Sequence, residues 1–514
     1  MEAEVPLHKH IIMVPYMAQG HLIPFLELAH RILHHNPIFT ITIVNTHLNI
    51  NYLRSAITNR PSAPHQIKLK SLPFNSSDHG LPPNSENTDG LPFTQIIKLF
   101  HATTALETPL RGFISDVIAD EGSPPVCIIS DVFMGWANEV AKSFGTVNYS
   151  FSTGGAYGSA AYCSIWMNLP HRNLTDGGTH EEFPVPGFPE SCRFSITQLH
   201  QYLIAADGKD EWSTFFQPQI SHSLQSNGWL CNTVEEIETM GCETLRNYIK
   251  LPVWCVGPLL PSKMLKKNTD SGIVGQRSGK QPAIRPEECI EWLDSHPQGS
   301  VLYISFGSQN TISETQMMEL AKGIEESEKP FIWVIRPPIG FDLKGEFRPE
   351  WLPTGFKDRV GKRGLVVHGW APQLEILCHE STGAFLSHCG WNSVMECLSQ
   401  GVPVIGWPLA AEQGYNAKML VEEMGVCVVL ARGVHGRIEK EEVKNVIKMV
   451  LDDGEEGKGN DMRRKASEVG KLIRESVDGS SYKAMDEFLS TILNRADHRG
   501  VECLNHDGLP KVRV

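Results

Sequence analysis

The sequence has no segment that resembles a membrane span or a secretion signal. No run approaches the roughly 18 apolar residues that a transmembrane helix needs. The first residues, Met1 to Pro6, lack the basic start and apolar core of a signal peptide. The 12 cysteines are scattered along the chain without C-x-x-C spacing, a pattern typical of free thiols in a reducing compartment. We therefore expect a cytoplasmic protein with no membrane span.

A basic surface is also absent. The formal net charge is -13, whereas a protein that binds nucleic acid needs a positive surface to neutralise phosphates. The same charge disfavours docking on anionic lipid. We expect small-molecule partners, no nucleic acid, and a chain that works as a monomer.

The fingerprints of three large enzyme classes are missing. Val274 stands where a P-loop ending in Gly279-Lys280 needs its first glycine, and Gln281 replaces the final Ser or Thr. A single glycine, Gly20, follows the first apolar run, which argues against the three-glycine dinucleotide turn. No G-x-S-x-G elbow is present either. A hydrolase or an oxidoreductase is therefore disfavoured.

Metal-binding patterns are weak. Glu27, His30 and His34 would share one helical face, but histidines near a helix end are also favourable for the helix dipole. No Asp-x-Asp triplet, the usual device for holding a divalent ion against a sugar-nucleotide diphosphate, occurs in the sequence. We expect no metal, so any bound diphosphate must be neutralised by amides and side chains.

The sequence does contain apolar runs that alternate with amphipathic segments. Such alternation is typical of parallel α/β sheets with both faces buried. Strands are expected at residues 10–16, 39–46, 126–132, 147–152, 228–233, 253–256, 301–306, 331–335, 365–368, 384–387, 404–406 and 426–430. Helices are expected at residues 22–35, 314–326, 392–400, 412–423, 440–451 and 461–476.

With 514 residues, the chain is longer than one hydrophobic core usually organises, and two domains are expected. Two Rossmann-like, doubly wound domains facing each other across a cleft would bind ligands at the carboxyl ends of their strands. Polar, glycine-containing stretches at 75–90 and 168–189 are interpreted as surface loops. The expected units are an N-terminal domain (1–261), a linker (262–286), a C-terminal domain (287–476), a helix packing back on the N-terminal domain (477–494) and a disordered tail (495–514).

One segment, WAPQLEILCHESTGAFLSHCGWNSVMECLSQGVPVIGWPLAAEQ at residues 370–413, has the pattern of a nucleotide site. A strand ending at His388 is followed by a glycine turn and a helix that begins near Asn392, and such a helix start presents free N–H groups to phosphate. His388, Asn392 and Ser393 add hydrogen bonds, Trp370 offers a face for a base, and Glu396 lies one turn further on, within reach of a ribose diol. Each of these residues also has a structural interpretation when it is taken singly. The aromatic side chains of Trp370, Trp391 and Trp407 could belong to the core, and Glu396 could be an exposed helical carboxylate.

These 44 residues closely resemble the signature box of plant family-one UDP-glycosyltransferases, which have the two-domain GT-B fold. The resemblance implies that Trp370 stacks on uracil while the backbone of the Ala371–Gln373 turn reads its edge. It implies that Glu396 holds the ribose, that His388, Asn392, Ser393 and Ser308 hold the diphosphate, and that Trp391, Glu412 and Gln413 face the sugar. Gln413 favours UDP-glucose as co-substrate, and Trp391 argues against a glucuronate donor.

The resemblance extends to a catalytic pair. His21, in the GHLIP sequence after the first strand, matches the family's general base, and Asp131, in SDVFMGW, matches its activating acid. Histidine suits proton abstraction because its pKa lies near the working pH, and a carboxylate fixes its tautomer. The alternative is that His21 caps the helix beginning near Leu22. The implied reaction is a single displacement with inversion, giving a β-glucoside.

The acceptor is expected to be a lipophilic flavonoid, phenolic or terpenoid hydroxyl compound, and the sequence does not decide among them. The acceptor pocket is expected to include the loops at 83–93 and 166–188 and the side chains Met17, Phe133, Phe151 and Tyr157. Gly20, Ser152 and Thr153 are expected near the donor sugar. Use of another UDP-sugar, or a catalytically inactive UDP-sugar-binding protein, remain as alternatives.

Overall fold

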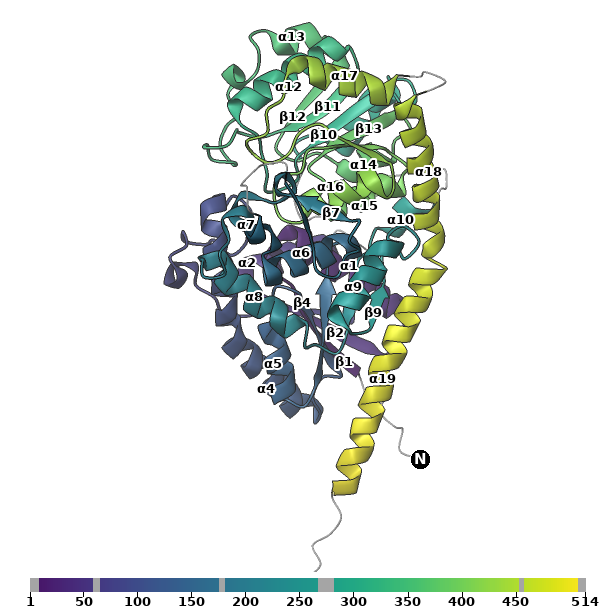
Figure 1. Cartoon of the computed structure of the whole chain (residues 1–514). Coiled ribbons are helices and arrows are strands. Elements are labelled where there is room, and N and C mark those ends of the chain that lie inside the picture. The colour runs from purple at the N-terminus through teal and green to yellow at the C-terminus, as the bar shows by residue number, and fades with distance from the viewer. Residues whose placement is uncertain (1–8, 59–64, 175–180, 267–281, 453–456, 507–514) are drawn as a thin grey trace, which may run out of the picture.

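The computed structural model describes residues 9–58, 65–174, 181–266, 282–452 and 457–506, without the side chains after Arg495. They form two α/β domains, one above the other in Figure 1, with two successive C-terminal helices that run beside the upper and then the lower domain. Each domain has one parallel sheet covered by helices on both faces. Within the described residues, no helix is long and apolar enough to cross a membrane.

The N-terminal domain is built on a seven-stranded sheet of order β3-β2-β1-β4-β5-β8-β9. Neighbouring strands are parallel throughout, which buries the central strands on both faces. Ile11 and Met13 pack with one hydrophobic cluster, and Ile12 and Val14 with another, as strand alternation requires. The strands are β1 (Lys9–Val14), β2 (Phe39–Asn45), β3 (Ile67–Ser71), β4 (Cys127–Asp131), β5 (Val147–Ser152), β8 (Trp229–Cys231) and β9 (Val253–Cys255).

The C-terminal domain repeats this plan with a six-stranded parallel sheet of order β12-β11-β10-β13-β14-β15. The apolar runs that predicted these strands are fully buried in β10, β11 and β13. The strands are β10 (Val301–Ser305), β11 (Phe331–Ile335), β12 (Gly364–His368), β13 (Thr382–Ser387), β14 (Val404–Gly406) and β15 (Cys427–Val429). All six expected strands of this domain are present.

Helices connect successive strands and cover both sheets. In the N-terminal domain they are α1 (Gln19–His35), α2 (His47–Thr58), α3 (Ile96–Ala102), α4 (Glu107–Glu121), α5 (Trp136–Ser143), α6 (Ala156–Asn168), α7 (Gln201–Ala205), α8 (Glu211–Ser223), α9 (Thr239–Ile249) and α10 (Ser262–Leu265). In the C-terminal domain they are α11 (Pro286–Asp294), α12 (Glu314–Ser327), α13 (Phe356–Val360), α14 (Gln373–Cys378), α15 (Trp391–Ser399), α16 (Gln413–Glu422), α17 (Lys440–Leu451) and α18 (Lys458–Ser476).

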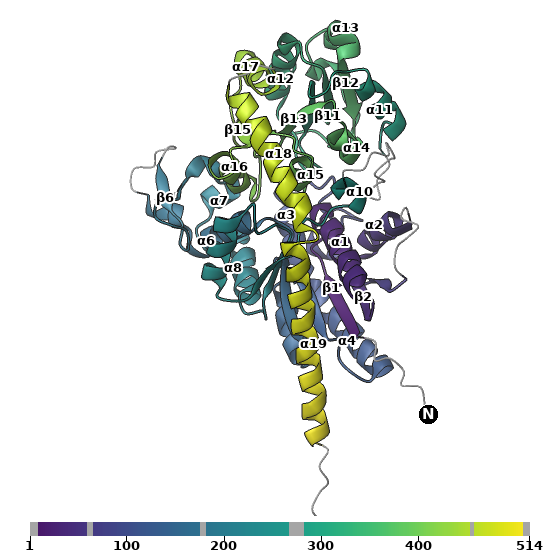
Figure 2. The same cartoon turned by 90° about the vertical axis from the view of Figure 1, so that its right-hand side faces the viewer.

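The last helix, α19 (Ser480–His506), crosses back to the N-terminal domain (Figure 2). Met485, Phe488, Leu489 and Ile492 are buried in the same cluster as the residues of α1 and β1. The helix continues to His506, which corrects the disordered tail expected from residue 495; residues 507–514 lie outside the described part of the chain. Because the packed part of α19 is already helical, further turns form without a new nucleation step, and the helix continues through the polar residues that follow.

Other departures lie in the expected loops and linker. Strand β3 was not predicted because its alternating, mostly exposed IKLKS sequence forms a sheet edge. The expected loop at 168–189 contains β6 (Glu182–Pro184), which pairs with β7 (Arg193–Ser195), although residues 175–180 lie outside the described part. The expected surface loop at 75–90 buries Leu81 and Thr88. The linker begins as helix α10, and its residues 267–281 are likewise outside the described chain.

Candidate active site

A cleft of about 370 Å³ lies between the two domains. Its walls contain residues from the segments that follow strands of both sheets. They include Phe133 after β4, Ser308 after β10, His388 after β13, and His21 in the first turn of α1, the helix that follows β1. Parallel strands present their carboxyl ends at one edge of the sheet, so residues distant in sequence meet there. The cleft is therefore where two facing α/β domains should bind ligands.

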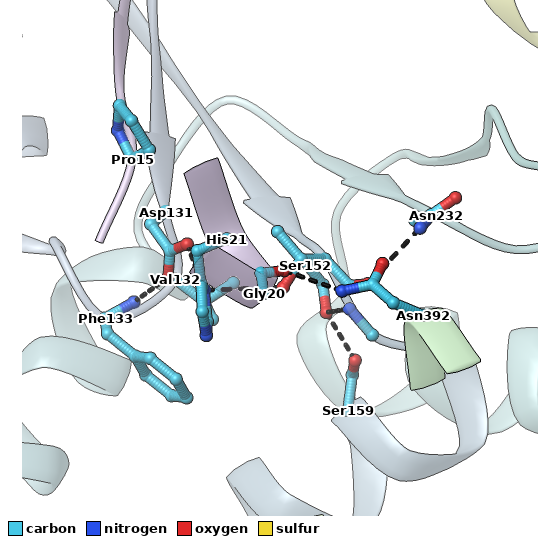
Figure 3. Close-up of polar contacts among 12 residues, drawn as sticks. Pro15, Gly20, His21, Asp131, Val132, Phe133, Ser152, Ser159, Asn232 and Asn392 are labelled. Atoms are coloured by element: carbon cyan, nitrogen blue, oxygen red, sulfur yellow. Dashed lines mark hydrogen bonds and ion pairs between the residues drawn. The ribbon is translucent and has the colours of Figure 1, made fainter. Parts of the chain in front are cut away.

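His21 and Asp131 form a hydrogen-bonded pair on the N-terminal wall (Figure 3). Strand β1 pairs with β4 in parallel, and Val14 lies opposite Ser130, so the segments that follow the two strands come together. The Nδ1–Oδ2 distance is 2.6 Å, and Asp131 is fully buried whereas 21% of the His21 side chain is exposed. The second carboxylate oxygen accepts the Phe133 N–H at 3.0 Å.

The pair sets the protonation chemistry of His21. Burial opposes the charged imidazolium, but the charge and hydrogen bond of Asp131, together with the charge of Glu412, raise the pKa of His21 above its ordinary value. With Nδ1–H held by the carboxylate, Nε2 carries the lone pair of the neutral ring. The helix-cap interpretation of His21 is wrong, because α1 begins at Gln19 with Ala18 as its N-cap residue.

The turn after β13 lies where the phosphate end of the cleft is expected. Helix α15 begins at Trp391, and its N-cap residue, Gly390, provides no side-chain cap. The first amides of this helix are therefore available to an anion at the positive end of the helix dipole. Asn392 donates from Nδ2 to the Gly20 carbonyl of the other domain at 2.8 Å (Figure 3), so this residue ties the two walls together.

Two glycines define the space around His388. A Cβ atom at Gly307 would lie 2.6 Å from His388 Nε2, and one at Gly390 would lie 2.5 Å from the same atom. Both positions therefore need glycine for the ring to keep its place. Burial, and then the charge of Arg336, lower the pKa of His388 to about 4, so the ring is neutral at physiological pH. Its Nδ1 has no hydrogen-bond partner among the described residues.

A polar network organises the expected ribose end. Gln373 donates from Nε2 to Glu396 Oε2 at 2.6 Å and to Ser393 Oγ at 3.1 Å, and its Oε1 accepts the Tyr303 hydroxyl at 3.0 Å. Glu396 is 7% exposed, which excludes its interpretation as an exposed helical carboxylate. Trp370 and Ala371 also line the cleft here.

The residues expected near the sugar lie at the interface between the domains. Trp391 is buried and donates from Nε1 to the Asn232 carbonyl of the N-terminal domain at 2.7 Å. Burial raises the pKa of Glu412. Gln413 accepts the Leu409 and Ala410 N–H groups with Oε1, each at 2.9 Å. The core interpretation applies fully only to Trp407, which is completely buried and does not line the cleft.

Gly20, Ser152 and Thr153 line the cleft on the opposite wall. Ser152 Oγ lies 2.6 Å from Ser159 Oγ, and Thr153 Oγ1 lies 3.4 Å from His21 Nδ1. The Thr153 hydroxyl therefore lies beside the catalytic candidate. Every residue assigned to the donor from the sequence lines this single cleft.

Sequence reasoning missed Arg336 and the contact that crosses the cleft beside it. Arg336 follows β11, lines the cleft and donates to the Ser308 carbonyl. Next to it, Gln309 donates to Thr88 of the N-terminal domain. A basic residue at the carboxyl end of a predicted strand was the available signal for Arg336. Nothing in the sequence pairs residue 309 with residue 88.

The acceptor side needs correction. Phe133 lines the cleft, but Met17, Phe151 and Tyr157 do not. Phe151 points to the opposite face of the sheet and packs against Phe25 at a ring-centroid distance of 4.9 Å, while Met17 is fully buried. Tyr157 packs on Phe188 and contacts Cys192. None of the described residues of the expected 166–188 loop lines the cleft, whereas Thr88 and Phe93 of the 83–93 loop do.

Aromatic side chains from several elements form this wall instead. Tyr16 stacks on Phe100 at 4.4 Å, and Phe133 packs near Tyr162 at 5.8 Å. Among the described residues that the N-terminal domain contributes to the cleft, none is Lys, Arg, Asp or Glu. The lining aromatic and histidine rings are Tyr16, His21, Tyr52, Phe93, Phe100, Phe133, Tyr162, His200, Trp212 and Trp229.

Comparison with known proteins gives a consistent result over the whole chain. The family described as UDP-glucoronosyl and UDP-glucosyl transferase matches residues 235–468, and the glycosyltransferase N-terminal domain matches residues 9–261. UDP-glycosyltransferase 92A1 of Arabidopsis thaliana is 43% identical over 497 residues, covering 94% of this chain and 97% of the relative. Crocetin glucosyltransferase 3 of Crocus sativus is 44% identical over 488 residues, covering 94% and 98%.

Comparison with solved structures agrees with the sequence comparison. The structure of Phytolacca americana UGT2 complexed with UDP-2fluoro-glucose and pterostilbene is similar to this chain with a TM-score of 0.72 at 27% identity. The similarity covers 94% of this chain and 99% of that one. The fold of both domains is therefore shared.

Proposed function

The chain belongs to the plant family-one UDP-glycosyltransferases and has their GT-B fold, and from this premise we propose that it glucosylates a small lipophilic metabolite. The donor is UDP-glucose, and the product is a β-O-glucoside. One observation carries the proposal: His21, which Asp131 holds from behind the wall, and residues of the donor segment 370–413 line one cleft from opposite domains. A base and a nucleotide cradle that face the same space can act on one reaction.

The proposed reaction is a single displacement. The acceptor oxygen attacks the anomeric carbon and its proton passes to Nε2 of His21, while the bond from that carbon to the UDP oxygen breaks. Asp131 keeps the ring in the reactive tautomer and stabilises the imidazolium that forms. Attack opposite the leaving group inverts the centre, so an α-linked donor gives a β-linked product.

The departing UDP gains negative charge, and groups on the C-terminal wall of the cleft can stabilise that charge. The free amides at the start of α15 supply oriented dipoles, and Arg336 supplies a positive charge that acts on His388. We propose that no metal takes part, because the phosphate end presents these donors and the sequence has no Asp-x-Asp triplet.

Glucose as the sugar rests on three residues. Gln413 ends the signature segment, Glu412 comes directly before Gln413, and Trp391 is the first residue of α15. All three line the cleft beside the contact between Asn392 and Gly20. A neutral amide and a carboxylate suit the hydroxyl groups of glucose, and no lysine or arginine lies among them to pair with the carboxylate of a glucuronate.

The acceptor class follows from the aromatic wall. A charged acceptor would lose its hydration without finding an opposite charge, because the described N-terminal lining has no acidic or basic side chain other than histidine. Flat aromatic walls favour flavonoids, simple phenolics and other lipophilic alcohols such as terpenoids.

The test is an acceptor screen with purified protein. UDP-[14C]glucose, UDP-galactose and UDP-glucuronate are each supplied with a panel of phenols and terpenoid alcohols, and products are identified by mass spectrometry. We expect glucosides from UDP-glucose and much less product from the other donors. Tight UDP binding without any transfer would instead indicate an inactive UDP-sugar-binding protein. Preferential use of another donor would refute the assignment of glucose.

A further inference from the structure

Helix α16 (Gln413–Glu422) belongs to the C-terminal domain, but its first turns pack against the N-terminal domain. It lies next to α6 in both views of the molecule (Figure 1 and Figure 2). Its N-cap residue, Glu412, and its first residue, Gln413, line the cleft, whereas Gly414 and Asn416 are buried and do not line it. Two residues proposed to face the sugar are therefore carried by a helix whose place depends on both domains.

The first contact with the N-terminal domain is at Gly414. A Cβ atom there would lie 2.1 Å from the main-chain carbonyl oxygen of Gln198, whereas an ordinary contact needs 3.4 Å or more. The short helix Ile196–Gln198 is held by a capping box, in which Gln198 Oε1 accepts the Ser195 N–H at 2.9 Å. A main-chain atom in a capped turn cannot rotate aside as a side chain can. This position on α16 therefore has room for glycine only.

The second contact lies on the other side of α16. Residues 414 and 416 point about 200° apart on a helix. Asn416 faces Gly158 of α6, where a Cβ atom would lie 2.4 Å from Asn416 Oδ1. Asn416 donates from Nδ2 to the Cys389 carbonyl at 3.0 Å and to Glu412 Oε1 at 3.4 Å, and these bonds fix the amide. The N-terminal domain therefore confines the start of α16 from two sides.

The start of α16 also faces the reacting end of the cleft. His21 lines the cleft from the N-terminal domain, and the charge of Glu412 contributes to the raised pKa of His21, so the two side chains lie near enough to interact. The residues proposed to hold the uracil, ribose and phosphates lie outside α16. A displacement of α16 would therefore move sugar-facing residues and leave the nucleotide site in place.

We propose that Gly414 is a positioning residue, which lets α16 pack directly on the N-terminal domain and so places Glu412 and Gln413 at the sugar of the donor. Gly414 acts through the helix and touches neither substrate. This inference rests on the proposed function. It assigns the placement of the transferred sugar to a contact between the domains, and not to the donor segment 370–413 alone.

The test is Gly414→Ala, which adds one methyl group where the Gln198 carbonyl leaves no room. Dissociation constants for UDP and for UDP-glucose are measured by isothermal titration, and kcat is measured with a glucosylated acceptor. We expect the affinity for UDP to stay within about twofold of the wild-type value and the affinity for UDP-glucose to fall about five- to tenfold, the value of a lost hydrogen bond. We expect kcat to fall by about 10–100-fold, since a misplacement of about 1 Å is enough for such a loss.

Gly459→Ala is the matched control. A Cβ atom at Gly459 would lie 1.9 Å from the Met449 carbonyl oxygen, so the clash is of the same kind. Both residues belong to the C-terminal domain, and neither lines the cleft. We expect a lower melting temperature, with kcat and the ratio of the two dissociation constants unchanged.

A second variant covers the case in which Gly414→Ala does not fold. Phe194 of β7 packs on Tyr415 of α16 at a ring-centroid distance of 5.9 Å, and neither residue lines the cleft. Phe194→Leu therefore loosens the contact between α16 and the N-terminal domain without a clash. We expect the same selective loss of UDP-glucose affinity, of smaller size.

The outcomes are distinct from those of the glycosyltransferase test. Equal changes in the two dissociation constants, no change in either, or a defect limited to the KM of the acceptor would each overturn the inference. Glucoside formation by the wild-type protein with an unchanged ratio in Gly414→Ala refutes the role of Gly414 and leaves the proposed function standing. A selective loss of UDP-glucose affinity in a protein that forms no glucoside refutes the function and supports the role of Gly414.

Discussion

The donor wall and the acceptor wall of the cleft are built in different ways. Most of the donor wall comes from residues 370–413, where a strand, a turn and a helix place Trp370, His388, Glu396 and Gln413 at fixed spacings. The acceptor wall takes single side chains from segments as far apart as Tyr16 and Trp212. A contiguous site is encoded by local geometry, whereas a dispersed one depends on how distant segments pack.

The two walls also differ in chemistry. The donor wall combines free helix amides, Arg336 and a network around Gln373, which suit a charged and hydroxylated ligand. The acceptor wall is aromatic and has two histidines, His21 and His200, of opposite character. The pKa of His21 is raised beside Asp131, and the pKa of His200 is lowered by burial. His21 is suited to accept a proton, whereas His200 stays neutral at physiological pH.

The largest effect is expected from Asp131→Asn. The amide no longer fixes the reactive tautomer of His21 or stabilises its charged form, so we expect kcat to fall by about 10²–10⁴-fold. The apparent affinity for UDP-glucose should change little, because Asp131 does not belong to the donor wall. Steady-state kinetics with both substrates varied would check this, and a variant that loses donor affinity but keeps kcat would contradict it.

The same variant predicts a change in pH dependence. His21 must be neutral to accept a proton, so kcat/KM of the wild-type enzyme should fall as pH decreases through a pKa that lies above the ordinary histidine value. Asp131→Asn removes the largest influence that raises this pKa, so the fall should move to lower pH. An inflection that stays in place would show that another group is titrating.

Gly390→Ala tests the donor wall alone. The added Cβ would lie 2.5 Å from His388 Nε2 and must displace the ring. We expect the KM for UDP-glucose to rise by about 10–100-fold, since a displacement of about 1 Å at a binding site is enough for such a loss. Acceptor binding should be unchanged. Gly112→Ala is the control, because a Cβ there meets nothing within 4 Å; an equal effect in both variants would refute the packing argument.

Phe133→Ala and Phe151→Ala compare a wall residue with a core residue. Phe133 lines the cleft, so its loss should raise the acceptor KM by roughly three- to tenfold, the value of an aromatic contact. Phe151 packs in the core, so its loss should lower the free energy of unfolding by about 3–5 kcal/mol. Kinetics on the first variant and denaturant titration of the second would check this. An acceptor-specific defect in a stably folded Phe151→Ala protein would reverse our placement of the two rings.

The smallest effect is expected from removal of divalent ions. The proposed phosphate end presents helix amides and Arg336, so EDTA should leave the initial rate within experimental error of the untreated enzyme. Collapse of the rate, with recovery on addition of Mg²⁺, would show that the donor wall needs a metal that the sequence does not indicate.

The sequence predicted most of the fold because buried parallel strands are short and nearly all apolar. It missed β3, whose exposed side chains at a sheet edge follow no apolar run, and the last turns of α19, where helix continuation outweighs polar composition. The proposed donor residues came from the strand, turn and helix pattern at 370–413 and from its resemblance to the family's signature box, and they line the cleft. The sequence wrongly placed three side chains in the acceptor pocket: Met17, Phe151 and Tyr157. An aromatic or apolar residue near the end of a strand can line a cleft or fill a core, and the sequence pattern is the same in both cases.

The most direct test of the account is His21→Ala, with donor binding and transfer measured on the same preparation. Isothermal titration should give a dissociation constant for UDP-glucose close to that of the wild-type protein, because the donor wall is intact. Mass spectrometry should find almost no glucoside, and NMR should show that the wild-type product has the β configuration. Near-wild-type turnover of His21→Ala, or an α-linked product, would contradict the proposal that His21 is the base of an inverting transfer.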